Sequence, residues 1–328
     1  MQGAKDRVSF PFRRRNSACQ SLVKALCCLV SLLVCDVGAS AQTCTVSMPA
    51  VAFGSVNVLT GTAVDTTSTM TVSCTGGGAF GIRLCISLGV GSAGDTTSRQ
   101  LTGPSSAKLR YDLYSDSART LLWGSWQTGY DTSGVQLDVP ANGSTPVTVN
   151  ARLLGSQQTA AAGSYSSTFT ANPFIQYANR FIAACPTGGK TTSTSTSATA
   201  TVLSSCNVSA TTLNFGTASV LTHNVDATSS LSVQCSNSLP YTVALNGGNS
   251  GATDPTQRKM ANGAAQITYG LYRDPARTLP WGSTTGSNTA AGTGTGAAQA
   301  LTVYGRVSAQ TTPAPATYQD TIVVTITY

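Results

Sequence analysis

The residue types that most often carry enzyme chemistry are scarce in this chain. Glutamate is absent from its 328 residues, and His223 is the single histidine. Glycosidases use paired carboxylates, whereas Asp112 and Asp116 lie in a block that occurs twice in the sequence. A Ser-His-Asp triad would have to use His223, and no GxSxG motif lies near it. We therefore expect no catalytic residues and a protein that is not an enzyme.

Cysteine is the remaining reactive residue type, and the N-terminus determines how many cysteines stay in the mature chain. Residues 1–41 are typical of a secretory signal peptide, with a charged head at Arg13–Arg15, an apolar run over Leu22–Val37 and small residues at Ala39–Ala41. A lipidated Cys35 is the alternative. Cleavage after Ala41 would leave six of the ten cysteines.

The same cleavage lowers the net charge. Residues 1–41 contain six Lys or Arg residues and two Asp residues, so the formal charge of +7 becomes +7 − 6 + 2 = +3. The Lys and Arg residues that stay are scattered and form no basic stripe. We therefore expect no nucleic-acid partner.

Two similar blocks show that the sequence contains one domain twice. Residues 111–125 are YDLYSDSARTLLWGS, and residues 269–283 are YGLYRDPARTLPWGS. Short alternating segments separated by Gly, Asn, Ser and Pro surround both blocks, which indicates strands. The fold class is predicted as all-β, with two tandem immunoglobulin-like β-sandwich domains, the second lacking its final strand. The expected strands are 69–73, 81–87, 108–114, 146–154 and 165–170, then 230–234, 241–245, 266–272, 300–307 and 318–328.

The repeat also suggests how the six cysteines pair. An even number of cysteines in an exported protein predicts disulfides. The first two cysteines of each copy have nearly equal spacing, and a Phe-Gly pair follows the first of them at the same distance. No CxxC motif is present, so neither a metal site nor a cofactor is expected. The predicted disulfides are Cys44–Cys74, Cys206–Cys235 and, from the remaining two, Cys85–Cys185.

The segment between the two copies has two interpretations. Residues 186–205 are rich in Thr and Ser, as in a flexible linker, but their small residues alternate as in an edge strand. We expect a strand near Ala198–Leu203, so that a strand within 190–203 closes the N-terminal domain, residues 42–185. The C-terminal domain, residues 206–328, has no corresponding segment.

The paired cysteines, the Phe-Gly pairs, the Y-x-L-Y-x-D…WG blocks and the final TITY together resemble the spore coat protein U domain. Two such domains behind a signal peptide resemble the tip adhesin of archaic, Csu-type chaperone–usher pili. The resemblance implies export through the periplasm to the surface of a Gram-negative bacterium. It implies four kinds of partner: a periplasmic chaperone, an outer-membrane usher, an adjacent pilin subunit that donates a strand, and an abiotic or host surface. A secreted coat or matrix protein is the alternative.

Strand donation would require an open groove in the C-terminal domain. The inward faces of its first and last strands supply the candidate donor-strand groove, and ordinary core packing is the alternative role for these residues. Cleavage after Ala41 leaves two residues before Cys44, too few for a strand to be donated in return. We therefore expect a subunit that accepts a strand at the fibre tip. The groove candidates are Leu213, Phe215, Ile322, Val324, Ile326 and Tyr328.

The N-terminal domain carries apolar loop residues that the C-terminal domain lacks. These apolar residues form three groups in the sequence, near the loops that gather at one pole of an immunoglobulin fold. Exposed apolar patches on a protein mark interaction sites. A sugar-binding site at the same pole is the alternative. Trp123 and Trp281 occur in both copies and are expected in the cores. The candidate adhesive residues are Phe80, Trp126, Tyr130, Phe174, Ile175 and Tyr177.

Overall fold

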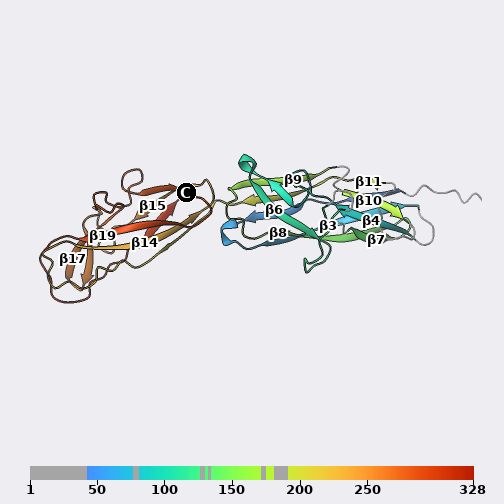
Figure 1. Ribbon diagram of the computed structural model, residues 1–328. Coiled ribbons are helices and arrows are strands. Elements are labelled where there is room, and N and C mark those ends of the chain that lie inside the picture. The colour runs from blue at the N-terminus through green and yellow to red at the C-terminus, as the bar shows by residue number, and fades with distance from the viewer. Residues whose placement is uncertain (1–42, 77–80, 126–129, 132–133, 171–174, 181–190) are drawn as a thin grey trace, which may run out of the picture. The chain divides into compact units, whose positions relative to one another are not determined.

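A computed structural model describes residues 43–76, 81–125, 130–131, 134–170, 175–180 and 191–328. These residues form two β-sandwiches (Figure 1), together with two short 3-10 helices, η1 (Val58–Thr60) and η2 (Pro104–Ser106). The predicted signal peptide lies outside the described residues, so its cleavage stays a prediction.

The first sandwich contains strands β1–β12. One sheet has the order β1-β3-β8-β6-β5-β9-β12-β2, and the other has the order β11-β10-β4-β7. Buried residues of both sheets form one core. The strands are β1 (Thr43–Ser47), β2 (Val51–Val56), β3 (Val64–Thr75), β4 (Ile82–Leu88), β5 (Arg99–Thr102), β6 (Lys108–Tyr114), β7 (Val135–Val139), β8 (Ser144–Leu153), β9 (Gly163–Phe169), β10 (Ile175–Arg180), β11 (Thr191–Thr192) and β12 (Thr196–Val202).

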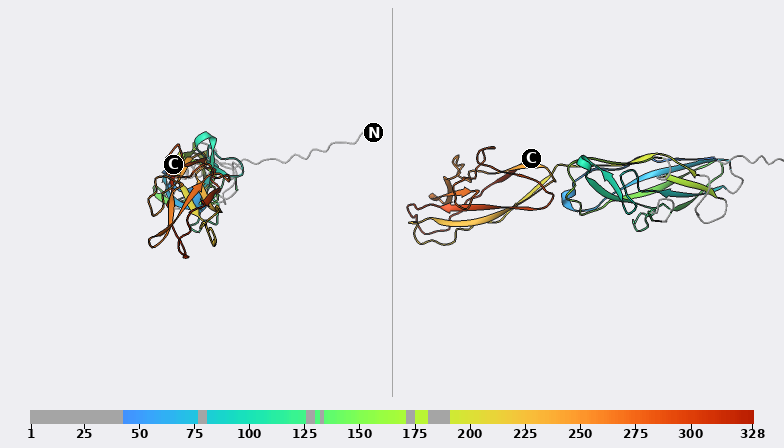
Figure 2. Two further views of the ribbon diagram at one scale, coloured as in Figure 1. Left: turned by 90° about the vertical axis from the view of Figure 1, so that its left-hand side faces the viewer. Right: turned by 45° about the horizontal axis from the view of Figure 1, so that its top comes forward.

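The second sandwich contains strands β13–β20 and has its own core. It is coloured from yellow through orange to red in Figure 2 and consists of strands and loops. Its sheets have the orders β13-β14-β19-β17-β16 and β18-β15-β20. The strands are β13 (Cys206–Ala210), β14 (Val225–Cys235), β15 (Pro240–Leu245), β16 (Arg258–Asn262), β17 (Ala265–Tyr272), β18 (Ala290–Thr293), β19 (Gln299–Val307) and β20 (Val324–Thr327).

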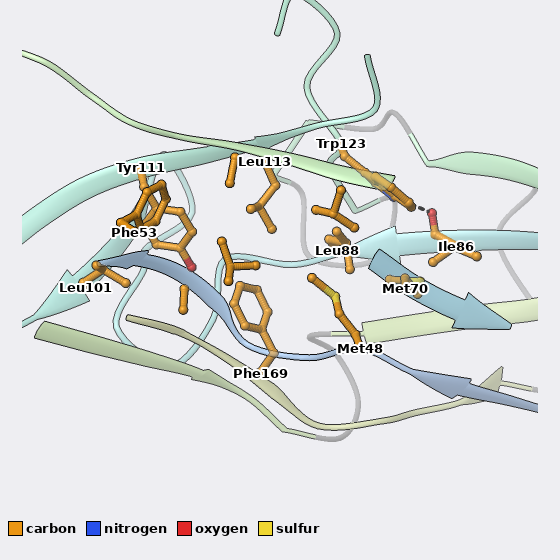
Figure 3. Close-up of a cluster of buried hydrophobic side chains, with 14 of the residues drawn as sticks. Met48, Phe53, Met70, Ile86, Leu88, Leu101, Tyr111, Leu113, Trp123 and Phe169 are labelled. Carbon is orange, nitrogen blue, oxygen red and sulfur yellow. Dashed lines mark hydrogen bonds between the residues drawn. The ribbon is translucent and has the colours of Figure 1, made fainter. Parts of the chain in front are cut away.

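The two tryptophans of the repeated block lie in the two cores, as the sequence predicted. Trp123 is fully buried and donates its indole N–H to the carbonyl oxygen of Ile86 (Figure 3). Trp281 makes the equivalent bond to Val243 in the second sandwich. A buried indole N–H needs such a partner. Trp123 and Ile86 of the first sandwich therefore correspond to Trp281 and Val243 of the second.

An aromatic pair and a tyrosine give further equivalent positions. Phe53 meets Tyr111 edge-to-face at 5.8 Å (Figure 3), and Phe215 meets Tyr269 in the same way at 5.9 Å. The Tyr165 hydroxyl donates to the carbonyl oxygen of Ala161, four residues upstream, and Tyr318 makes the same bond to Ala314. This is the tyrosine corner of immunoglobulin-like sandwiches. Position 53 thus corresponds to 215, and position 165 to 318.

The turn in the repeated block is stabilised by an aspartate side chain. The Asp116 carboxylate accepts hydrogen bonds from the backbone N–H groups of Thr120 and Leu121. The Arg119 guanidinium instead forms an ion pair with Asp65 at 3.4 Å. A carboxylate that caps backbone N–H groups within its own turn leaves the arginine free to reach a neighbouring strand. Asp274 and Arg277 repeat this arrangement in the second sandwich.

Each sandwich also buries one arginine, which the sequence did not reveal. Arg99 and Arg258 are fully buried, and their guanidinium groups donate to backbone carbonyl oxygens. Arg258 joins the end of β15 to the tryptophan loop, because it donates to the carbonyl oxygens of Leu245, Asn246, Pro255 and Trp281. Five fixed donors make arginine suited to satisfy several carbonyls at once.

Candidate functional site

The sandwiches differ most at the strand that follows the tyrosine corner. In the first sandwich, β12 lies between β2 and β9, parallel to β2 and antiparallel to β9. Its inward-facing residues Ala198, Ala200 and Val202 are buried. Residues 186–205, for which the sequence allowed either a strand or a linker, therefore contain a strand of the first sandwich.

No strand occupies this position among the described residues of the second sandwich. The segments equivalent to β2 and β9, residues 212–217 and 318–323, are irregular. The predicted strand over 318–328 begins only at Val324, where β20 pairs with β15. An extended segment needs neighbours to bond its backbone groups, and here one neighbour is missing. The second sandwich thus lacks its final strand, as predicted.

The backbone of 318–323 shows which side is unpaired. Gln319 exchanges both backbone hydrogen bonds with Ala261 of β16, and Val323 bonds to Asn246. Successive residues of an extended chain direct their N–H and C=O groups to opposite sides. The backbone groups of Tyr318, Asp320 and Ile322 therefore point toward the empty position and have no backbone partner within the described part of the chain.

A groove lies between the two irregular segments. One cavity of about 560 Å³ is bounded by residues 210–215 and 317–322, and a second of about 320 Å³ continues along residues 216–219 and 312–316. Leu213, Phe215 and Tyr318 line both cavities. We call this continuous space the acceptor groove.

Four of the six predicted groove residues line the acceptor groove. Leu213, Phe215, Ile322 and Val324 border it and are half-buried. Ile326 packs against the core of the second sandwich, and Tyr328 is 56% exposed. Both lie beyond the groove because β20 turns away to pair with β15. The role of all six residues in strand acceptance stays a prediction.

The structure also places a charged side chain in the groove that the sequence analysis missed. Asp320 lies on the same face of its segment as Tyr318 and Ile322, and it lines the larger cavity. Its carboxylate accepts a hydrogen bond of 2.7 Å from the Tyr269 hydroxyl. Burial, followed by this hydrogen bond, raises the pKa of Tyr269. In the sequence, Asp320 stands at alternate positions with Tyr318 and Ile322, and this alternation was the pattern that could have placed it on the inward face.

One of the predicted adhesive residues is not available at the surface. Tyr130 is buried, its ring lies 4.7 Å from the Arg99 guanidinium, and its hydroxyl donates to Asp112. Burial raises the pKa of Asp112, and its hydrogen bond with Tyr130 opposes that rise. The expectation that Tyr130 is exposed is therefore corrected, because a buried arginine holds its ring by a cation–π contact.

The other predicted adhesive residues stay untested. Ile175 and Tyr177 lie on β10, which pairs with β4, and so belong to a strand. Phe80, Trp126 and Phe174 lie outside the described residues.

Two of the predicted disulfides are confirmed. Cys44 is bonded to Cys74, and Cys206 is bonded to Cys235. Cys85 is also disulfide-bonded, and its predicted partner Cys185 falls outside the described ranges. Where the chain is described, no three His, Cys, Asp or Glu side chains gather as metal ligands. The same residues include no helix long and apolar enough to cross a bilayer.

The family comparison agrees with the repeat. The model of the Spore Coat Protein U domain matches residues 31–172 and again residues 191–325. The chain belongs to this family. A curated relative, Protein U of Myxococcus xanthus, is 36% identical over 129 residues, which cover 36% of this chain and 72% of that protein.

Solved structures show a related fold. A chain of the CsuC–CsuE chaperone–tip adhesion subunit pre-assembly complex, from the archaic chaperone–usher Csu pili of Acinetobacter baumannii, matches with a TM-score of 0.51 and 17% identity. The match covers 87% of this chain and all of that chain. The CupB6 tip adhesin of Pseudomonas aeruginosa matches with a TM-score of 0.38 and 12% identity over 86% and 93% of the two chains, too weakly to support an argument.

Proposed function

We propose that this chain is the tip subunit of a chaperone–usher pilus and that its acceptor groove receives a strand from the adjacent pilin subunit. The observation that supports this is internal to the molecule. In the first sandwich the same position is filled by β12, which bonds to both neighbours and buries three small side chains. A strand added to an open sheet edge gains affinity from backbone hydrogen bonds and specificity from alternate side chains.

The proposal implies a set of partners and a route. An open groove lined by apolar residues is an aggregation hazard before assembly. A periplasmic chaperone would cover it, an outer-membrane usher would exchange the chaperone for the adjacent subunit, and the chain would reach the cell surface. The fold shared with the tip subunit of the Acinetobacter complex supports this assignment.

In this proposal the first sandwich attaches the fibre to an abiotic or host surface and thereby promotes biofilm formation. The support is in the sequence, where the first copy has the apolar residues Phe80, Trp126 and Phe174 and the second copy lacks them. Apolar contact predicts binding to bare plastic that detergent weakens, whereas inhibition by one free glycan would indicate a carbohydrate-binding adhesin.

The first prediction tests strand acceptance directly. The sequence of β12, TSATATV, is appended after Tyr328 through a flexible linker as long as the segment between Arg180 and Thr191. We expect the tail to fill the groove and to stabilise the second sandwich by about 2 kcal/mol, or about 10 °C in Tm. Hydrogen exchange should slow at residues 212–217 and 318–322, where the backbone gains partners.

A tail of equal length provides the matched control. It carries Asp in place of the three inward-facing residues of TSATATV and should leave both Tm and exchange unchanged, because buried unpaired charges oppose insertion. If both tails act alike, or if residues 318–322 already exchange slowly without a tail, strand acceptance is wrong.

A second candidate function has one supporting observation. The identity to Protein U of Myxococcus xanthus is higher than the identity to the pilus structure. A secreted coat or matrix protein would be stable and monomeric without a chaperone. Co-expression with and without a candidate periplasmic chaperone distinguishes the two, since only the pilus subunit should depend on it for its yield.

A further inference from the structure

Asp320 is an unusual residue to find in an apolar strand-acceptor groove. It lies between Tyr318 and Ile322, on the face where the first sandwich places Tyr165 and Phe169. The tyrosine-corner equivalence aligns Asp320 with Ser167, a residue that is 1% exposed. The second sandwich therefore has a carboxylate where the closed first sandwich has a hydroxyl.

The hydrogen bonds of Asp320 leave part of the carboxylate free. One oxygen accepts from the backbone N–H groups of Asn249 and Thr321, both at 2.8 Å, and the other accepts only from the Tyr269 hydroxyl. An ionised carboxylate has about four acceptor positions. These three hydrogen bonds thus leave acceptor capacity on a carboxylate that lines the groove.

The carboxylate cannot easily withdraw from the groove. A Cβ atom placed on Gly248 would lie 2.0 Å from the Asp320 oxygen that accepts from Tyr269, so the loop backbone packs against the carboxylate. Gly248 itself has a φ of 69°, which favours glycine at this position. Asp320 is therefore held in place and faces whatever strand enters.

The register of β12 identifies the residue that would face Asp320. Ser167 pairs with Ala198, and the side chains of such directly opposed residues lie on the same face about 5 Å apart. Ala198 is fully buried beside Ser167. A strand inserted in the second sandwich in this register would place its third residue, counted as in TSATATV, against Asp320.

We propose that Asp320 is a specificity determinant of the acceptor groove and selects a donor strand with a short hydroxyl side chain, Ser or Thr, at this third position. This inference rests on the proposed strand acceptance. A hydroxyl supplies the missing hydrogen bond to a charged acceptor. A bulky apolar residue would overfill the position and leave the carboxylate unsatisfied. An acidic residue would place two like charges together.

The experiment varies one residue of the appended tail in the full chain. Tails with Ala, Ser, Val or Asp at the third position are compared by hydrogen exchange at residues 318–322, which reports the equilibrium between inserted and free tail. We expect insertion of the Ser tail to be about tenfold more favourable than that of the Ala tail. The Val tail should be about tenfold less favourable than Ala, and the Asp tail lower still.

Two variants of Asp320 separate selection from a purely structural role. Asp320→Asn keeps an oxygen that accepts from the Asn249 N–H and puts an NH2 group, which can donate to the Tyr269 hydroxyl, in place of the second oxygen. Because it removes the charge, it should rescue insertion of the Asp tail. Asp320→Ser reproduces the first sandwich and should remove the preference for the Ser tail over the Ala tail. Equal insertion of all four tails, or no rescue by Asp320→Asn, would overturn the selectivity alone. Insertion of none of the tails would instead overturn strand acceptance.

Discussion

Replacing Arg258 by methionine is expected to destabilise the second sandwich by about 3 kcal/mol or more. The substitution keeps an apolar stem but removes the guanidinium donors to the carbonyl oxygens of Leu245, Asn246, Pro255 and Trp281. Each buried group left unsatisfied costs about 1–3 kcal/mol. Because the groove already leaves this sandwich short of one strand, we expect a loss of this size to unfold a large fraction of it at 37 °C.

Hydrogen exchange with peptide resolution measures the two sandwiches separately. Arg306→Met is the matched control, since Arg306 forms a partly exposed ion pair with Asp226 at 2.8 Å, and ion pairs at the surface contribute about 0–1 kcal/mol. Slow exchange of β15 and β17 in the Arg258→Met variant, equal to that of the Arg306→Met variant, would contradict the proposed role of Arg258.

Removing the Cys206–Cys235 disulfide by alanine substitution of both residues should cost about 3–4 kcal/mol. This value follows from the entropy of closing a loop with a sequence separation of 29. The Cys44–Cys74 disulfide closes a loop of nearly equal length, with a separation of 30, so its removal should cost about the same. The consequences differ, because only the first sandwich has a strand of its own at the closing position.

Calorimetry of the two double variants compares these outcomes. Without Cys44–Cys74, the first sandwich should still unfold in a cooperative transition at a lower Tm. Without Cys206–Cys235, the transition of the second sandwich should disappear, and the appended TSATATV tail should restore it. Retention of that transition without the tail would show that the open groove does not limit stability.

The sequence was informative wherever a pattern repeats or alternates. The strand predicted at 108–114 is observed as β6 with those bounds. The duplicated cysteine spacing identified two disulfides, because equivalent copies must close equivalent loops. Trp123 and Trp281 occur in both copies and lie in the two cores. Such features depend on local periodicity or on the repeat, and both can be read without a structure.

Other features depend on three-dimensional neighbours that leave no local pattern. Arg99 and Arg258 are buried because free carbonyl oxygens at strand ends converge on them, whereas arginine in a sequence is normally expected at the surface. Tyr130 was expected in an exposed loop, but its partners Arg99 and Asp112 come from β5 and β6. The strand expected from 318 is irregular before Val324, because alternation cannot show whether a neighbouring strand exists.

The position of β12 has a mechanical consequence. β12 ends at Val202 and β13 begins at Cys206, so the two sandwiches are joined through the end of the strand that closes the first one. Tension along the polypeptide between them therefore pulls on β12 itself. Two ladders resist its withdrawal, one to β9 and one to β2. The first sandwich thus carries load through a strand that is clamped on both sides, whereas a strand at a sheet margin could peel away one bond at a time.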